Sequence, residues 1–333
     1  MLSRLFLRNP GTRAFYEQFV ARPDYSIWKW LHGYVYGRWP QLYIALGTGR
    51  HPLARALTTL LSLFRRAAVS GEVPESTRPG SISIGPGSIE PGSIGLGNSG
   101  HKTFADTYHG KVLHLDHARK LVTVNRDIDL GDLEQVVPYA AAREIVLRHP
   151  DHILALDCPC RASSPNPCLP VGVCLIVGEP FAGFIAAHHP EKSRWITQEE
   201  AQEILKAEHD RGHVHHAFFK DVMLGRFYAI CNCCSCCCGA LRAHRGGTPM
   251  LASSGFICIM DRTLCVDCGL CAKQCQFRAI QRRGGEWEVD STACMGCGVC
   301  VPRCPQAALN LVRAPHRGEP LDIQEIMTRR GLS

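Results

Sequence analysis

The distribution of apolar and polar residues along the chain predicts a protein that mixes helices with strands. Apolar residues at helical spacing predict four helices, at residues 52–66, 139–148, 197–210 and 321–330. The third has Thr197 at its start and Glu200 three residues later, which is the pattern of a capping box. Short apolar segments predict strands at residues 111–115, 120–125, 153–156, 174–177, 226–230 and 256–260. The expected fold class is therefore α+β.

Changes in composition divide the chain into five segments. Residues 1–70 are basic and hold three of the five tryptophans. Residues 71–100 repeat Pro-Gly-Ser-Ile three times, a composition that is typical of a flexible linker. The rest is expected to form a cysteine-rich mixed α/β domain at 101–252, a repeat-containing domain at 253–314 and a tail at 315–333.

The net charge of +7 is concentrated in the N-terminal segment. Residues 1–70 hold ten Lys and Arg against two acidic residues, so the remaining 263 residues carry a net charge of −1. This local bias does not indicate a nucleic-acid partner. Two interpretations of the segment stay open. It docks on a membrane surface or an acidic partner, or it forms a helical subdomain packed on the central domain, with Trp28 and Trp30 in its core.

Cysteine usage restricts the classes of function. No run of about 18 apolar residues occurs, and the N-terminus lacks the apolar stretch of a secretory signal. We therefore expect a cytoplasmic protein, free or peripheral at the inner face of the membrane. All 19 cysteines lie between Cys158 and Cys304. Clustered cysteines without an export signal indicate metal or iron–sulfur ligands in a reducing compartment.

An internal repeat holds eight of these cysteines. Residues 261–275 match residues 290–304 with an offset of 29 at every cysteine and at the leading aspartate. Each copy has the spacing C-x2-C-x2-C-x3-C. Three thiolates on one tight loop, with Gly269 or Gly298 inside it, can reach three irons of a cubane, and the fourth cysteine points toward the other cluster. Zinc ribbons share the C-x2-C pairs, but the third close cysteine is poorly suited to them.

Residues 255–314 resemble the bacterial two-[4Fe–4S] ferredoxin family through this repeat. The resemblance implies a pseudo-twofold ferredoxin fold with two [4Fe–4S] clusters and one-electron transfer. It implies that cluster one takes Cys265, Cys268, Cys271 and Cys304, and that cluster two takes Cys294, Cys297, Cys300 and Cys275. One position departs from the family pattern, because Cys275 is followed by Gln276 where Cys304 is followed by Pro305.

Ten further cysteines lie in the central segment: Cys158, Cys160, Cys168, Cys174, Cys231, Cys233, Cys234, Cys236, Cys237 and Cys238. Two groups of them follow predicted strands, and alternate residues of an extended chain share a face. The simplest hypothesis is one or two further [4Fe–4S] clusters, which join Cys158 and Cys160 with Cys231 and Cys233 and involve Cys168 or Cys174. Zinc ligands, a redox-active dithiol and buried structural thiols are the alternatives.

Weaker signals come from isolated residues. Cys258, in the predicted strand 256–260, is expected to pack in the core. His209, His213, His215 and His216 could ligate a metal or transfer protons, but an exposed loop after the third helix is the favoured interpretation. His188 and His189 are interpreted in the same way.

These observations favour an iron–sulfur electron-transfer protein with a redox protein as donor and another as acceptor. One alternative is an oxidoreductase whose central cluster reduces a small substrate with electrons from the ferredoxin segment. The other is a metal or redox sensor, or an assembly factor, that holds metal in its cysteine-rich loops.

Overall fold

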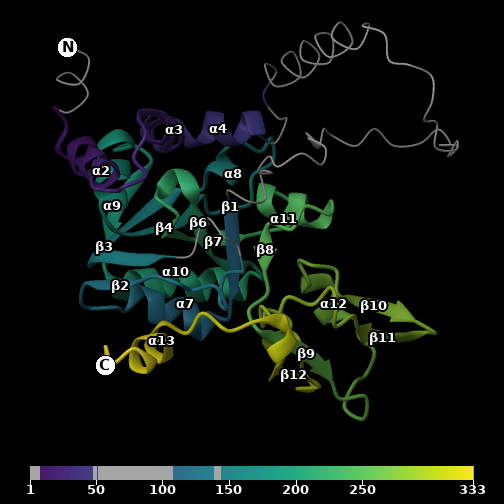
Figure 1. The fold of residues 1–333 in the computed structure, drawn as a ribbon. Coiled ribbons are helices and arrows are strands. Elements are labelled where there is room, and N and C mark those ends of the chain that lie inside the picture. Colours follow the sequence, from purple (N-terminus) through teal and green to yellow (C-terminus); the bar gives the residue numbers. More distant parts are fainter. Residues whose placement is uncertain (1–7, 48–50, 52–107, 139–143, 333) are drawn as a thin grey trace, which may run out of the picture.

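The computed structural model describes residues 8–47, 51, 108–138 and 144–332. The predicted helix at residues 52–66 and the predicted linker at residues 71–100 lie outside these ranges. Among the described residues, the chain forms a central sheet with helices on both faces, and a smaller domain follows it at the C-terminal end (Figure 1).

An eight-stranded sheet is the centre of the molecule. Its order is β2-β3-β4-β7-β6-β1-β8, with β5 beside β3, and the pairs are antiparallel except for β1 with β8. The strands are β1 (Tyr108–Leu113), β2 (Ile128–Leu130), β3 (Ile145–Asp157), β4 (Gly172–Glu179), β5 (Ser193–Ile196), β6 (Val214–Lys220), β7 (Arg226–Cys233) and β8 (Leu251–Ala252). Because both faces are covered, β6 is buried along its whole length.

Two sets of helices cover the two faces of this sheet (Figure 1). One face carries α7 (Leu115–Val122), α10 (Gln198–Asp210) and α13 (Ile323–Arg329). The other carries α2 (Pro10–Val20), α3 (Ile27–Arg38), α4 (Pro40–Gly47), α8 (Pro159–Ala162), α9 (Phe181–His188) and α11 (Gly239–Arg245). Thr197 caps α10 as predicted, since its Oγ1 accepts a hydrogen bond from Glu200 N at 3.2 Å, while the Glu200 carboxylate pairs with Arg194.

The N-terminal helices pack on the sheet through aromatic side chains. Phe15 of α2 stacks on Phe184 of α9 with ring centroids 4.5 Å apart. Trp30 is buried as expected, but Trp28 is 74% exposed, so its placement in the core was wrong. Trp28 follows the helix-capping Ser26 and points away from the face that Trp30 and Tyr34 bury. Docking of residues 1–70 on a membrane or an acidic partner stays a prediction. No helix among the described residues is both long and apolar enough to span a membrane.

Two predictions of secondary structure are wrong, one at α7 and one at the start of β3. Residues 120–122 belong to α7 rather than to a strand, because Leu115, Ala118, Leu121 and Val122 share one buried helical face. The predicted helix at residues 139–148 is wrong at its end, since Ile145, Val146 and Leu147 begin β3 and pair with β2. A short apolar segment fits the sequence pattern of a helix as well as that of a buried strand. Here the pairing of residues 145–147 with β2 makes the segment a strand.

The C-terminal domain consists of two strand pairs and short helices. β9 (Phe256–Met260) pairs with β12 (Leu309–Arg313), and β10 (Ile280–Arg283) pairs with β11 (Glu286–Val289). Each cysteine loop continues into a short helix, α12 (Leu270–Gln274) in the first repeat and the 3-10 helix η2 (Val301–Arg303) in the second. The chain then returns to the main sheet, where α13 packs on α7.

Candidate metal centres

The nineteen cysteines are all free thiols, and eighteen of them form four groups. The outer repeat site holds Cys265, Cys268, Cys271 and Cys304. The inner repeat site holds Cys275, Cys294, Cys297 and Cys300. The six-cysteine ring holds Cys158, Cys160, Cys174, Cys231, Cys233 and Cys238. The four-cysteine group holds Cys168, Cys234, Cys236 and Cys237.

The two repeat sites are cavities of similar size, about 350 Å³ for the outer site and about 360 Å³ for the inner site. Each takes three cysteines from one repeat and the fourth from the other repeat. The fourth cysteines have equivalent partners, since Ala308 N donates to Cys304 Sγ at 3.3 Å and Ala279 N donates to Cys275 Sγ at 3.2 Å. Hydrogen bonds from backbone N–H groups stabilise thiolate ligands of clusters. This donor set fits a cubane in each cavity.

Glycine allows both cysteine loops to close. Gly269 and Gly298 have positive φ angles of 70° and 79°. A Cβ atom at Gly269 would lie 2.8 Å from the Trp287 ring, and one at Gly298 would lie 2.7 Å from the His114 ring. Cys258 is buried beside the inner repeat site, with its Sγ 3.6 Å from Cys300 Sγ.

The six-cysteine ring is assembled from four separate parts of the chain. Cys158 and Cys160 flank the start of α8, Cys174 lies on β4, Cys231 and Cys233 lie on β7, and Cys238 caps α11. Each thiol interacts with two others, in the closed order 158–160–238–233–231–174. The Sγ atoms of Cys174 and Cys231 lie 4.0 Å apart. The ring lines a cavity of about 780 Å³, opening included.

Contacts between the thiols give the cysteines of this ring very different pKa values. Hydrogen bonds from Cys174 and Cys233 lower the pKa of Cys231 to about 6, and hydrogen bonds from Cys160 and Cys233 lower the pKa of Cys238 to about 5. Its contact with Cys160 raises the pKa of Cys158 to about 12. Six thiols in mutual contact therefore cannot all ionise without a counter-charge, and a cluster of iron ions supplies such a charge to thiolate ligands.

A buried arginine fastens three cysteine-bearing segments together. Arg161, which directly follows Cys160, is 1% exposed. Its guanidinium donates to Pro170 O, beside the Cys168 segment, and to Asn232 O on β7 at 3.0 Å. It also pairs with buried Glu208 of α10 at 2.5 Å. Burial opposes the charge of Arg161, but Glu208 outweighs burial and raises the pKa of the guanidinium.

Asn232, between Cys231 and Cys233, is the second polar link inside this frame. Its Nδ2 donates to Val173 O, beside Cys174, at 2.7 Å. Its Oδ1 lies 2.6 Å from His215 Nδ1. Asn232 therefore fixes β7 relative to β4 and β6, which together carry three of the six ring cysteines.

The histidine-rich segment is not an exposed loop, so that interpretation was wrong. His215 and His216 lie on buried β6, and His209 and His213 are also buried. Burial lowers the pKa of His209 to about 4 and that of His215 and His216 to about 3, so these three are neutral at pH 7. His209 lies in the last turn of α10, whereas His215 and His216 are neighbours on β6 and therefore face opposite sides of the sheet, where helices cover both.

His188 and His189 are also not in an exposed loop. They end α9, and each holds an N-terminal helix against the central domain. His188 Nε2 lies 2.8 Å from Thr12 Oγ1, and His189 Nε2 lies 2.8 Å from Gly37 O.

Two tyrosines line the ring cavity, one from a helix and one from the sheet. Tyr36 of α3 and Tyr228 of β7 both line it, and their hydroxyl oxygens are 2.7 Å apart. Lys220 Nζ lies 4.5 Å from the centroid of the Tyr36 ring. Burial lowers the pKa of Lys220 to about 8.

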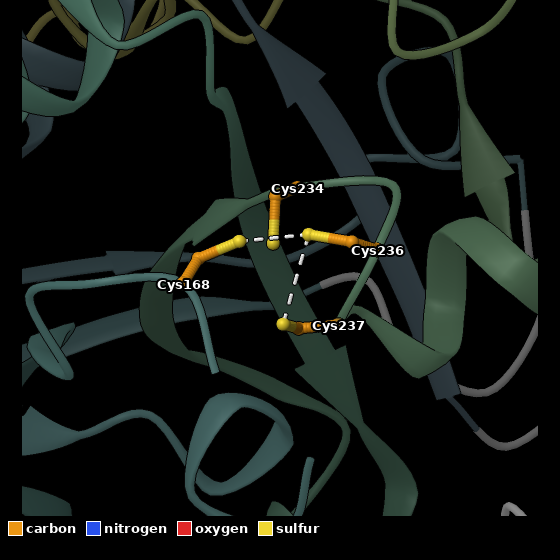
Figure 2. A group of neighbouring side chains, drawn as sticks. All are labelled: Cys168, Cys234, Cys236 and Cys237. Atoms are coloured by element: carbon orange, nitrogen blue, oxygen red, sulfur yellow. Dashed lines mark hydrogen bonds between the residues drawn. The ribbon is translucent and has the colours of Figure 1, made fainter. Parts of the chain in front are cut away.

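The four-cysteine group lies beside the ring but is arranged differently (Figure 2). Its four Sγ atoms lie within 4.8 Å of one another. Cys168 comes from the loop before β4, and the other three come from the turn after β7. The sequence hypothesis left Cys168 and Cys174 as alternatives for one site; Cys174 lies in the ring and Cys168 lies in the four-cysteine group.

Gln276, the departure from the ferredoxin pattern, connects the inner repeat site to the central domain. Its Oε1 accepts a hydrogen bond from Ser235 N at 2.8 Å, inside the four-cysteine turn. Its Nε2 donates to Gly212 O at 2.8 Å. The next residue, Phe277, lines the inner repeat cavity and belongs to the same buried core as the ring cysteines.

Sequence reasoning did not identify Arg161, Asn232 or Glu208 as part of this region. Two local signals were available: Arg161 follows a C-P-C segment, and Asn232 is flanked by cysteines that share a site. Glu208 had no such signal, because it is a helical glutamate until α10 packs against β6 and α8.

Residues 260–308 match the family model described as the 4Fe-4S dicluster domain. They form such a domain, and the resemblance to two-cluster ferredoxins is confirmed for this region. No curated protein and no solved structure matches the chain significantly. The dicluster domain and the clustered cysteines support an iron–sulfur electron-transfer role.

Proposed function

We propose that the chain is an electron-transfer protein with one [4Fe–4S] cluster in each repeat site and a further iron–sulfur cluster in the six-cysteine ring. One observation carries the proposal. Six thiols from four segments of the chain, four of them buried and two half-buried, converge on one cavity and interact as a closed ring. A purely structural role would not require so many thiols in mutual contact, because thiolate repulsion rises with each ionisation.

The position of the inner repeat site supports transfer between the two domains. Phe277 lines the inner repeat cavity, and its ring centroid lies 6.4 Å from that of His216. The His216 ring is in turn 5.8 Å from Phe218, which lines the ring cavity. Packed side chains of one buried core thus join the two candidate centres.

The outer repeat site supports exchange with a separate redox protein. Cys268 is exposed, and the apolar residues around it are exposed as well, Val266 at 60% and Leu270 at 44%. Exposed apolar residues around a redox centre are typical of docking surfaces. The proposed order is therefore redox partner, outer repeat site, inner repeat site and six-cysteine ring.

The test is the metal content of the full chain purified without oxygen. We expect about twelve or more iron and sulfide per chain, of which the repeat sites account for about eight. The double variant Cys174→Ser/Cys231→Ser should fall to about eight and should keep the electron paramagnetic resonance signals of the repeat clusters.

The matched control is Cys258→Ala, which removes a buried thiol that lines the inner repeat cavity but lies outside the repeat pattern of ligands, and it should keep the wild-type iron content. About eight iron in the wild type, unchanged in the double variant, would contradict a cluster in the ring. Labile, substoichiometric metal without a reversible redox couple would instead favour the sensor or assembly role.

A substrate-reducing enzyme is the second candidate, and the size of the ring cavity favours it. The cavity is about 780 Å³, opening included, against about 360 Å³ for the inner repeat site. The Tyr36–Tyr228 hydroxyl pair could donate protons there. An external ligand such as cyanide should change the spectrum of a ring cluster with an open coordination position, and should leave a fully ligated cluster unchanged.

A further inference from the structure

The four-cysteine group has the dimensions of a site for a single ion. Its four Sγ atoms lie within 4.8 Å of one another, with 2.7 Å between Cys168 and Cys236 and 3.7 Å between Cys236 and Cys237. Four thiolates bound tetrahedrally to zinc at about 2.3 Å stand about 3.8 Å from each other. Figure 2 shows the sulfur atoms of Cys168, Cys234 and Cys236 gathered together, with that of Cys237 next to them.

The repeat sites provide an internal comparison. In a cubane each cysteine binds a different iron, so the thiolates are separated by the width of the cluster. No three of the eight repeat cysteines, all of which are described, lie within 4.8 Å of one another. The same holds for the six-cysteine ring. Of the four groups, only the four-cysteine group is too compact for a cubane. Its Cys236–Cys237 distance of 3.7 Å matches one tetrahedral ion, and Cys168 and Cys236, 2.7 Å apart, would separate by about 1 Å to bind it.

The surroundings of the group match a closed structural site. All four positions come from the protein, which leaves no open position for a substrate. Both backbone polar groups of Ser235, inside the turn, are bonded: its N–H donates to Gln276 Oε1, and its carbonyl accepts from Arg245 Nη2 at 2.9 Å. These bonds hold the turn that carries Cys234, Cys236 and Cys237. The fourth ligand, Cys168, comes from the separate loop before β4.

From these observations we infer that Cys168, Cys234, Cys236 and Cys237 bind one zinc ion, which fastens the loop before β4 to the turn after β7. This assigns the four central cysteines that the proposed ring cluster leaves over. The four ligands bind as thiolates, so binding releases their protons and requires no oxidant or reductant. The turn also carries Cys233 and Cys238 at its two ends, and Cys234 and Cys237 themselves line the ring cavity, so the zinc would position two ring cysteines from the edge of that cavity.

The test measures zinc, iron and acid-labile sulfide in the full chain, purified without oxygen from cells supplied with both metals. We expect about one zinc per wild-type chain. The double variant Cys168→Ser/Cys236→Ser should lose the zinc. The reciprocal variant Cys174→Ser/Cys231→Ser should keep the zinc while it loses iron and sulfide. Absence of zinc from the wild type, or its retention in the Cys168→Ser/Cys236→Ser variant, would overturn the assignment.

A second measurement uses only the wild type, in case the variants do not fold. X-ray absorption at the zinc edge should find four sulfur neighbours at about 2.3 Å. Nitrogen or oxygen neighbours would overturn the assignment. Iron in place of zinc, at one per site and without extra sulfide, would overturn it too. Because the zinc edge does not report on iron, failure here leaves the proposed ring cluster standing, and failure of the ring cluster leaves the zinc site standing.

Discussion

The repeat sites and the six-cysteine ring solve the same problem, the gathering of thiols, in opposite ways. The outer repeat site takes three of its cysteines from residues 265–271, so a single loop sets most of its geometry. The ring takes its six cysteines from four segments between Cys158 and Cys238, so the sheet must form before the site exists. The comparison teaches that a local site needs only its loop, whereas a dispersed site depends on a supporting frame.

That frame has an energetic consequence. The ring is held by buried polar groups, chiefly Arg161, Glu208 and Asn232, which must all be paired because unpaired buried charges are costly. The repeat sites rest instead on backbone hydrogen bonds and glycine loops. Changes in the frame should therefore affect the ring and spare the repeat sites.

The largest expected effect comes from Arg161→Met. Removal of one partner of a buried ion pair leaves Glu208 buried without its buried cation, with only His213 and the half-exposed Arg211 beside it, which costs about 3–5 kcal/mol. Hydrogen exchange should show a loss of this size in the local stability of β4 and β7, together with loss of iron from the ring. Exchange in β9 and β12 should stay at the wild-type level.

Arg211→Met is the matched control for that variant. Arg211 Nη1 also pairs with Glu208, at 3.0 Å, but its side chain is 45% exposed. Its loss should cost less than about 1 kcal/mol. Equal effects of the two variants, or loss of iron from the repeat sites in Arg161→Met, would contradict the division between local and dispersed sites.

The same division explains how much the sequence alone could predict. The repeat cysteines were recognisable because their ligands recur at short, fixed spacing, and β9 and α13 follow from local apolar patterns. Cys231 and Cys233 were expected to share a site because they alternate on a strand, and they do line one cavity. The separation of Cys168 from Cys174 could not be predicted, since it depends on how the loop before β4 folds back. The burial of His215 and His216 likewise depends on helices distant in sequence.

A smaller effect is expected where the two regions meet. Gln276→Ala removes both hydrogen bonds between the dicluster domain and the central domain at this position, to Ser235 and to Gly212. The loss should weaken docking of the domains by roughly 1–3 kcal/mol. Limited proteolysis and hydrogen exchange should detect more frequent opening of the β7–α11 turn.

Gln281→Ala is the control for this contact, because Gln281 bonds only locally, to Arg278 O at 2.8 Å. It should leave opening of the turn unchanged. If Gln276→Ala behaves like Gln281→Ala, then Gln276 does not couple the regions, and its departure from the ferredoxin pattern has no structural role at the junction.

The smallest change in stability, but the sharpest test of function, comes from His216→Leu. The imidazole is fully buried and neutral at pH 7, and neither ring nitrogen has a hydrogen-bond partner within the described chain. Leucine is of similar size, so the free energy of unfolding should change by less than about 1.5 kcal/mol and the iron content should not change. Transfer between the inner repeat site and the ring should nevertheless slow, because the variant removes the aromatic ring between Phe277 and Phe218.

Phe219→Leu provides the control for this last test. Phe219 is equally buried and lies on the same strand, but it packs in the core on the opposite face of the sheet. Rapid freezing after photoreduction should show slower oxidation of the inner cluster in His216→Leu and the wild-type rate in Phe219→Leu. Equal rates in all three proteins would place the transfer path elsewhere. The ring would then have to exchange electrons through the Gln276 contact or with a partner of its own, and the order of centres proposed above would be wrong.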